Sequence, residues 1–98
     1  APLFPFETRF GFEVFELTLL PGYERLSEAH EVGVTEHVIV VRGRMEVLVE
    51  AQWISLAEGD AVRFSADRPH GYRNTQADPA VFHNLIHYIH HSAPGGQP

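Results

Sequence analysis

Two short segments of the chain bring together the side chains best suited to binding or proton exchange. In the first, His30 and Glu36 lead toward Gly43, and in the second, His70 and Asn74 follow a Gly-Asp pair at fixed distances. Imidazole, carboxylate and amide groups can hold a cation, exchange a proton or hydrogen-bond a polar ligand. These two segments are therefore the strongest candidates for a functional site.

Other chemistry finds little support in the sequence. The chain has no cysteine, which excludes a thiolate nucleophile, a disulfide scaffold and a cysteine-ligated zinc finger. The serines lack the motif of a nucleophile elbow, and no glycine-rich loop is suited to cradling a phosphate. Nucleophilic catalysis and nucleotide binding are accordingly not expected.

The charge balance limits the partners of the chain. Its 98 residues carry 13 carboxylates and 7 basic side chains, all of them arginine, for a formal net charge of −6. An acidic domain repels phosphate groups, so we expect no binding to nucleic acid or to a membrane by this domain itself. No apolar run approaches the roughly 20 residues of a membrane-spanning helix, and the length is that of a single domain.

Period-2 alternation and turn residues predict an all-β domain, a sandwich or a barrel, with no helix beyond one turn near the N-terminus. We interpret Arg42-Gly43 as the turn of a hairpin that joins two of the strands. The predicted domain spans residues 10–91, after an N-terminal extension at 1–9 and before a Pro- and Gly-rich disordered tail at 92–98. The expected strands are 10–20, 36–41, 45–50, 53–56, 61–64, 70–74 and a long last one from residue 80.

Strand parity orders the candidate residues. If Glu36 points inward, Val38 does too and His37 points away. His70, Tyr72 and Asn74 share one face, which puts a phenol and an amide beside the proposed site. In the last strand both faces are partly apolar, so parity leaves open whether the face of His83 and His87 or the opposite one lines the interior.

The two segments resemble the two motifs of the cupin superfamily. HEVGVTEHVIVVRG is similar to the first motif, and GDAVRFSADRPHGYRN is similar to the second. The spacings agree from Glu36 to Gly43 and from Gly59 through His70 to Asn74. The resemblance implies a single double-stranded β-helix, also called a jelly-roll barrel.

The resemblance also implies a ligand set for a divalent metal, Zn, Fe, Mn or Ni. Metal-binding cupins use two histidines and a glutamate of the first motif and a histidine of the second. Carried over, this leaves His30, Glu36 and His70, because Val32 stands where the second histidine would be. Two imidazoles and a carboxylate can form a facial triad, but a lost ligand is equally what a metal-free domain would show. His83 is a possible replacement ligand if its face lines the barrel. The alternative is a half-buried histidine held by a backbone carbonyl or by a partner at an interface.

The run from FEVFELTLLPGYE through ADRPHGYRN resembles more narrowly the C-terminal cupin domain of helix-turn-helix regulators of the XRE family. That resemblance implies a cytoplasmic domain that senses a small-molecule effector, while DNA is bound by an N-terminal helix-turn-helix domain absent from these residues. The lack of an initiating methionine fits this expectation. Tyr72, Asn74 and His83 would then line the effector pocket beside His30, Glu36 and His70.

Two other functions compete with the sensor. One is a stand-alone metal-dependent enzyme, an oxygenase or isomerase, built on His30, Glu36 and His70. The other is a structural or storage barrel that binds no ligand. In each case the apolar outer parity of Ile39 and Val41, together with Phe10 and Phe12, predicts a homodimer through that face.

Overall fold

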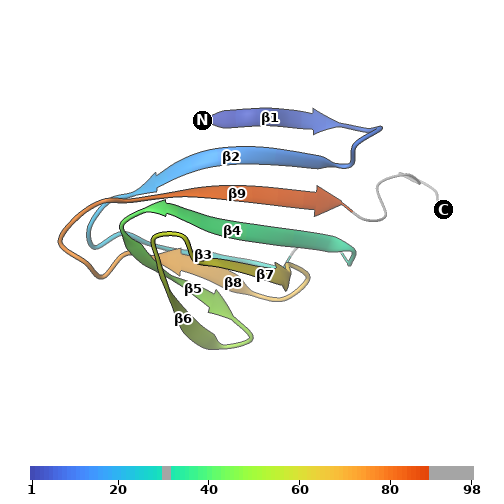
Figure 1. The fold of residues 1–98 in the computed structure, drawn as a ribbon. Coiled ribbons are helices and arrows are strands. Elements are labelled where there is room, and N and C mark those ends of the chain that lie inside the picture. The colour runs from blue at the N-terminus through green and yellow to red at the C-terminus, as the bar shows by residue number, and fades with distance from the viewer. Residues whose placement is uncertain (30–31, 89–98) are drawn as a thin grey trace.

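The computed structural model describes residues 1–29 and 32–88, and every regular element among them is a β-strand (Figure 1). The absence of helix from the described residues confirms the predicted all-β class. No helix of the described part of the chain is long and apolar enough to cross a membrane. The strands are β1 (Pro2–Glu7), β2 (Phe12–Leu19), β3 (Glu24–Ser27), β4 (Val34–Arg42), β5 (Arg44–Val49), β6 (Gln52–Ala57), β7 (Ala61–Ser65), β8 (His70–Arg73) and β9 (Ala80–Tyr88).

The strands form two antiparallel sheets. The first has the order β1-β2-β9-β4-β7, and the second has the order β3-β8-β5-β6. Strands far apart in the sequence lie side by side in this order. The last strand, β9, for example, lies between β2 and β4 (Figure 1). The inner faces of both sheets supply the hydrophobic core, which contains Leu19, Val34, Val38, Val40, Met45, Val47, Leu56, Phe64, Ala66, Tyr72, Ala80 and Phe82.

The hairpin predicted at Arg42-Gly43 is wrong. β4 pairs with β7 and β9, whereas β5 pairs with β6 and β8, so this turn carries the chain from one sheet to the other. Gly43 adopts φ 85°, and a Cβ at this position would lie 2.7 Å from the carbonyl oxygen of Pro79. The crossing is therefore tight enough to require glycine. The hairpin in this region instead joins β5 to β6, through Glu50 and Ala51 at φ 50° and 66°.

Two strands were not expected. The N-terminal segment, predicted as an extension with a helical turn, forms the edge strand β1, which pairs with β2 and places Phe4 opposite Val14. β3 lies in the polar stretch before residue 34 and pairs with β8, with Arg25 opposite Tyr72. β3 is largely exposed, so it lacks the apolar alternation by which sequence patterns reveal a strand.

The predicted parity of β4 is confirmed. Glu36 and Val38 are buried, while His37 turns to the other face and Ile39 remains 42% exposed. This alternation arises because successive side chains of a strand point to opposite faces. It aims the carboxylate of Glu36 into the space between the sheets.

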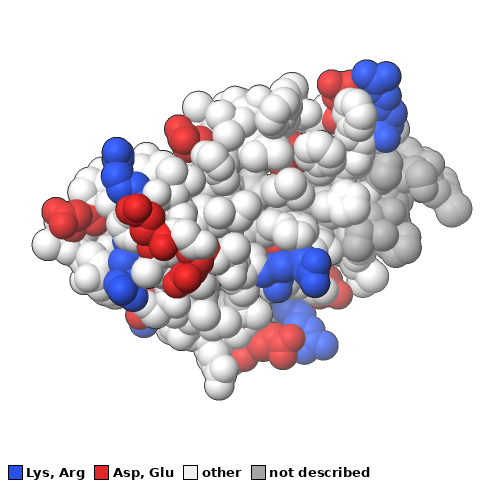
Figure 2. Space-filling model, viewed as in Figure 1, with Lys and Arg blue, Asp and Glu red and all other residues white. Residues whose placement is uncertain are grey.

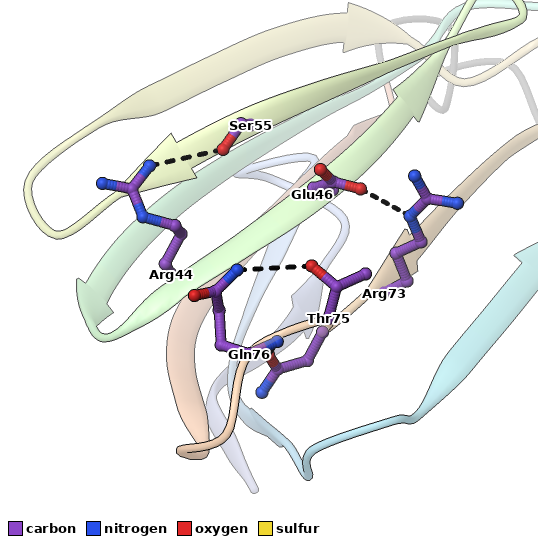
Figure 3. Close-up of polar contacts among 7 residues, drawn as sticks. Arg44, Glu46, Ser55, Arg73, Thr75 and Gln76 are labelled. Atoms are coloured by element: carbon purple, nitrogen blue, oxygen red, sulfur yellow. Dashed lines mark hydrogen bonds and ion pairs between the residues drawn. The ribbon is translucent and has the colours of Figure 1, made fainter.

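The second sheet carries ordered polar contacts on its outer surface (Figure 3). The Nε atom of Arg73 donates to Glu46 at 2.5 Å, and its guanidinium lies 4.0 Å from the centre of the Trp53 ring. Arg44 donates to Ser55 at 3.4 Å. These arginines thus serve partners within the sheet.

Charged side chains are unevenly spread over the surface. In the view of Figure 2 they gather at the left, at the upper right and below the middle of the molecule, and the middle of the band over β2 and β9 is largely uncharged. Ile39 and Val41, predicted to lie on the outer face, are 42% and 43% exposed, and Phe10 is 50% exposed. The described residues thus leave apolar surface uncovered in the single chain.

Candidate functional site

The centre of the site is a buried cluster in which the two sheets meet. Glu36 comes from β4 of the first sheet, and His70 and Tyr72 come from β8 of the second. The three residues are 1%, 2% and 7% exposed, respectively. The Tyr72 hydroxyl donates to Oε1 of Glu36, and Nε2 of His70 lies 3.2 Å from Oε2. The two sequence motifs are therefore brought together at Glu36, His70 and Tyr72.

Hydrogen bonds decide where the protons lie in this cluster. Nδ1 of His70 is 2.9 Å from the carbonyl oxygen of Arg68, and a carbonyl can only accept, so Nδ1 carries a proton. Burial by itself lowers the pKa of His70, but the hydrogen bonds to Glu36 and Arg68 raise it above its ordinary value. The imidazole therefore favours its charged form, with Nε2 donating to the carboxylate.

The same contacts set the state of the other two groups. Burial raises the pKa of Glu36, but hydrogen bonds from His70 and Tyr72 outweigh it and hold that pKa below the ordinary value. Burial and the neighbouring charge of Glu36 raise the pKa of Tyr72 far above its usual range. The cluster is thus an ion pair beside a phenol that keeps its proton.

Asn84 on β9 is a member of the site that the sequence analysis missed. The residue is 5% exposed and helps to lower the pKa of Glu36, and its Oδ1 is buried without a hydrogen-bond partner. Asn84 lies directly opposite Val38 in the pairing of β4 with β9. Because residues directly opposite each other share a face, the inward direction of Val38 also predicts an inward Asn84, but only once the register of β4 with β9 is known.

A cavity of about 710 Å³ opens beside the cluster. The buried polar residues at its floor are Glu36, Tyr72 and Asn84. The more exposed polar residues toward its opening are Arg25, Ser27 and Glu28. Its apolar lining includes Phe15, Leu17, Leu19, Leu26, Phe82 and Ile86. Apolar walls with a few converging polar groups are the usual composition of a small-molecule site.

The other predicted pocket residues lie elsewhere. Asn74 is buried, but its Nδ2 donates to the carbonyl oxygens of Leu19 and Asp78 at 3.0 and 2.8 Å, and its Oδ1 accepts from the amide of Gln76. It therefore organises a turn, and it does not line the cavity.

His83 faces away from the cavity. Its Nε2 lies 3.0 Å from Oε2 of Glu16, across the pairing of β9 with β2. The face that lines the cavity carries Phe82, Asn84 and Ile86. This settles the parity of β9, because His83 and His87 share the opposite face, and His83 cannot replace the missing motif ligand.

The described residues do not fit a metal centre. They include no group of three or more His, Cys, Asp or Glu side chains able to hold a metal ion, and His30 lies outside them. Val32, at the place of the second motif histidine, is 77% exposed. The two candidate ligands that are described, Glu36 and His70, are paired with each other. We therefore derive no chemistry through a metal.

Comparison with known proteins decides the family. The family model described as "Cupin_2: Cupin domain" matches residues 15–88, a range that includes Glu36, His70, Tyr72 and Asn84. The chain belongs to the cupin family. This cupin fold is the double-stranded β-helix that the two sequence motifs implied, which confirms the expected architecture.

The relatives of this cupin include transcriptional regulators. It is 42% identical over 86 residues to "HTH-type transcriptional regulator SutR" of Escherichia coli (strain K12), a match that covers 88% of this chain and 48% of the relative. The cupin thus spans about half the length of that curated relative.

Two solved structures are similar in sequence and fold. The Cupin_2 domain of an XRE family transcriptional regulator from Enterobacter cloacae is 43% identical with a TM-score of 0.87, covering 90% of this chain and 93% of that one. An HTH_3 family transcriptional regulator from Vibrio cholerae is 40% identical with a TM-score of 0.85, covering 89% and 48%, respectively. These comparisons confirm the predicted resemblance to the cupin domains of XRE-family regulators.

Proposed function

We propose that this cupin domain binds a small-molecule effector in the cavity beside Glu36, Tyr72 and Asn84, and that binding controls DNA recognition by a helix-turn-helix domain of the same protein. The similarity to regulators about twice as long supports the second half of the proposal. The net charge of −6 fits a division of labour in which another domain binds DNA. A regulator of this kind acts in the cytoplasm.

The observation that carries the proposal is the unpartnered carbonyl oxygen of Asn84 at the floor of the cavity. A buried acceptor without a partner costs on the order of 1–3 kcal/mol. An N–H or O–H group of a ligand that enters the cavity would satisfy this acceptor. The apolar walls would bury the rest of the ligand, so binding would gain from both contributions.

Arg25, which lies toward the opening of the cavity together with Glu28, suits an acidic or polar group of a ligand. Arg25 lines the cavity, and its positive charge is close enough to the Tyr72 hydroxyl to lower the pKa of that group slightly against the larger effects that raise it. Among the described residues, its guanidinium has no ion-pair partner. The effector would thus carry a hydrogen-bond donor near Asn84 and an anionic or strongly polar group near Arg25.

The sheet offers a route from the cavity toward the N-terminus. Phe15, Leu17 and Leu19 of β2 line the cavity, and β2 pairs directly with β1. The backbone nitrogen of Ala1 donates to the carbonyl oxygen of Glu16, and the amide of Glu16 donates to the carbonyl oxygen of Ala1. A ligand that favours one position of β2 would therefore bias the position of β1 and of a DNA-binding domain that precedes it.

A homodimer completes the proposal. DNA-binding regulators of the helix-turn-helix class commonly bind two half-sites as dimers. The exposed apolar side chains Ile39 and Val41 on the outer face of the first sheet supply a patch for a second copy. Equilibrium sedimentation would test it, with Ile39→Glu expected to shift the chain toward monomer.

Calorimetric titration with a panel of hydroxy acids, amino acids, and matched simple carboxylates and alcohols tests the effector proposal. Compounds that carry both a donor and an anionic group should bind more tightly than those that carry one, and Arg25→Gln should weaken only the anionic ones. Arg44→Gln, whose arginine bonds Ser55 outside the cavity, is the matched control. Chemical conversion of a bound compound by the purified chain would contradict the sensor and favour the enzyme.

A further inference from the structure

A second polar site lies on the outer face of the first sheet, opposite the effector cavity. Three adjacent strands, β7, β4 and β9, bring five side chains together there. Thr35 is paired with both Ser65 and His87. Two residues further along β4, on the same outer face, His37 is paired with Arg63. Neighbouring strands are about 4.8 Å apart and alternate residues on one strand about 7 Å apart. Two imidazoles, a guanidinium and two hydroxyls therefore converge within one small area.

These side chains surround a hollow in the surface. Its volume is about 480 Å³, and its lining is completed by Phe64, with no carboxylate among the lining residues. His37 is half-buried, and its Nδ1 is buried without a hydrogen-bond partner. Among the described residues, Arg63 and His87 likewise have no ion-pair partner. The polar groups of the hollow are thus available to bind a group from outside the described part of the chain.

The electrostatics of the hollow run against those of the whole protein. The chain has a net charge of −6, yet three basic groups face one another here with no acidic side chain between them. Burial, the charge of Arg63 and then that of His87 lower the pKa of His37. An anion in the hollow would relieve this repulsion, whereas a metal cation would add to it.

We propose that this hollow binds a small oxyanion, a phosphate or carboxylate group, held by Arg63, His37 and His87. The guanidinium offers parallel N–H donors that match the oxygens of such groups. Each imidazole can add an N–H, and Thr35 and Ser65 can add hydroxyl donors. Because His37 and Glu36 are successive residues of β4, they point to opposite faces, and the anion site is separate from the effector cavity.

Inorganic phosphate is the probe that tests this site. The chain is titrated at constant pH with sodium phosphate and, as a control for ionic strength, with sodium chloride. The readout is the ring resonances of His37 and His87. We expect saturable shifts with phosphate alone, and an affinity at least about tenfold weaker in Arg63→Gln, since one charged hydrogen bond is lost. His87→Gln provides a second variant with the same expected direction.

The matched control is His83→Gln, because His83 lies on the same face of β9 but is paired with Glu16. This variant should bind phosphate like the wild type. Equal responses to phosphate and chloride would overturn the proposal, as would unchanged affinity in both Arg63→Gln and His87→Gln. If phosphate gives no saturable shift while Arg63→Gln dissociates a dimer in sedimentation, carboxylates of a second copy fill the hollow and the small-anion proposal is wrong.

Discussion

Glu36 and His70 belong to different sheets, and their charged atoms Oε2 and Nε2 lie 3.2 Å apart with each side chain 2% exposed. The pair therefore joins the two halves of the barrel at its centre. Removal of His70 takes one hydrogen-bond donor and a compensating charge from the buried Glu36 carboxylate, which is more costly than the loss of an exposed ion pair.

This relationship predicts the effect of His70→Ala on stability. The free energy of unfolding should fall by about 3–5 kcal/mol, as for other buried pairs broken on one side. His83→Ala removes a histidine from the more exposed pair with Glu16 and should cost about 0–1 kcal/mol. Urea denaturation measures both, and equal costs in the two variants would contradict the central role of the Glu36–His70 pair.

The same pair predicts how stability depends on pH. The pKa of His70 is raised in the folded state, so its contribution is fully present below the unfolded-state pKa of about 6.5 and is lost as pH rises through the folded value. The pKa of Glu36 is lowered, so its contribution is present above the unfolded-state value of about 4.3 and is lost as pH falls through the folded one. Stability from the pair should thus be greatest between these unfolded-state values.

Denaturation measured across this pH range checks the prediction. The wild-type free energy of unfolding minus that of His70→Gln should shrink as the pH rises above the raised pKa of His70. A difference that instead grows in alkaline solution would contradict the assigned proton positions.

Gly43 and Gly22 form a matched pair of backbone tests. Both adopt positive φ, 85° and 80°, but a Cβ at Gly43 would lie 2.7 Å from the Pro79 carbonyl oxygen, whereas nothing lies within 4 Å at Gly22. Each alanine variant loses about 1 kcal/mol or more from the strained conformation. Gly43→Ala should lose more, because the sheet-to-sheet crossing must also move. Thermal unfolding compares the two, and an equal loss would contradict the tight crossing.

Metal content gives a further prediction. Because Glu36 and His70, the two described candidate ligands, are paired with each other, protein purified without a chelator should contain metal well below one equivalent. Elemental analysis of the wild type and His70→Ala should agree. Stoichiometric metal in the wild type that disappears in His70→Ala would support the competing metal-dependent enzyme.

The predictable parts of the fold and the site were those with a local signal. Alternation in β4 revealed the inward direction of Glu36, and the spacing of the two motifs placed Glu36 and His70 in the same predicted site. The β4–β5 turn was misread because a glycine turn has the same local pattern whether the next strand pairs beside it or crosses to another sheet. Asn84 was missed because β9 is apolar on both faces, so only its register with β4 reveals the face that lines the cavity.

The anion hollow illustrates the same limit. His37, Arg63 and His87 are far apart in sequence and join only through the pairing of β4 with β7 and β9. No single segment carries a recognisable motif for them. Such a site follows from strand order, which depends on long-range pairing that local patterns do not encode.

The most direct test of the account is the affinity of an effector for the cavity when its unpartnered acceptor is removed. The tightest ligand of the hydroxy-acid and amino-acid panel is titrated calorimetrically into the wild type, Asn84→Leu and the control Arg44→Gln. We expect saturable binding to the wild type and the control, and at least about a tenfold loss of affinity in Asn84→Leu, the equivalent of one buried hydrogen bond. Undiminished binding to Asn84→Leu, or no binding by any member of the panel to the wild type, would contradict this expectation.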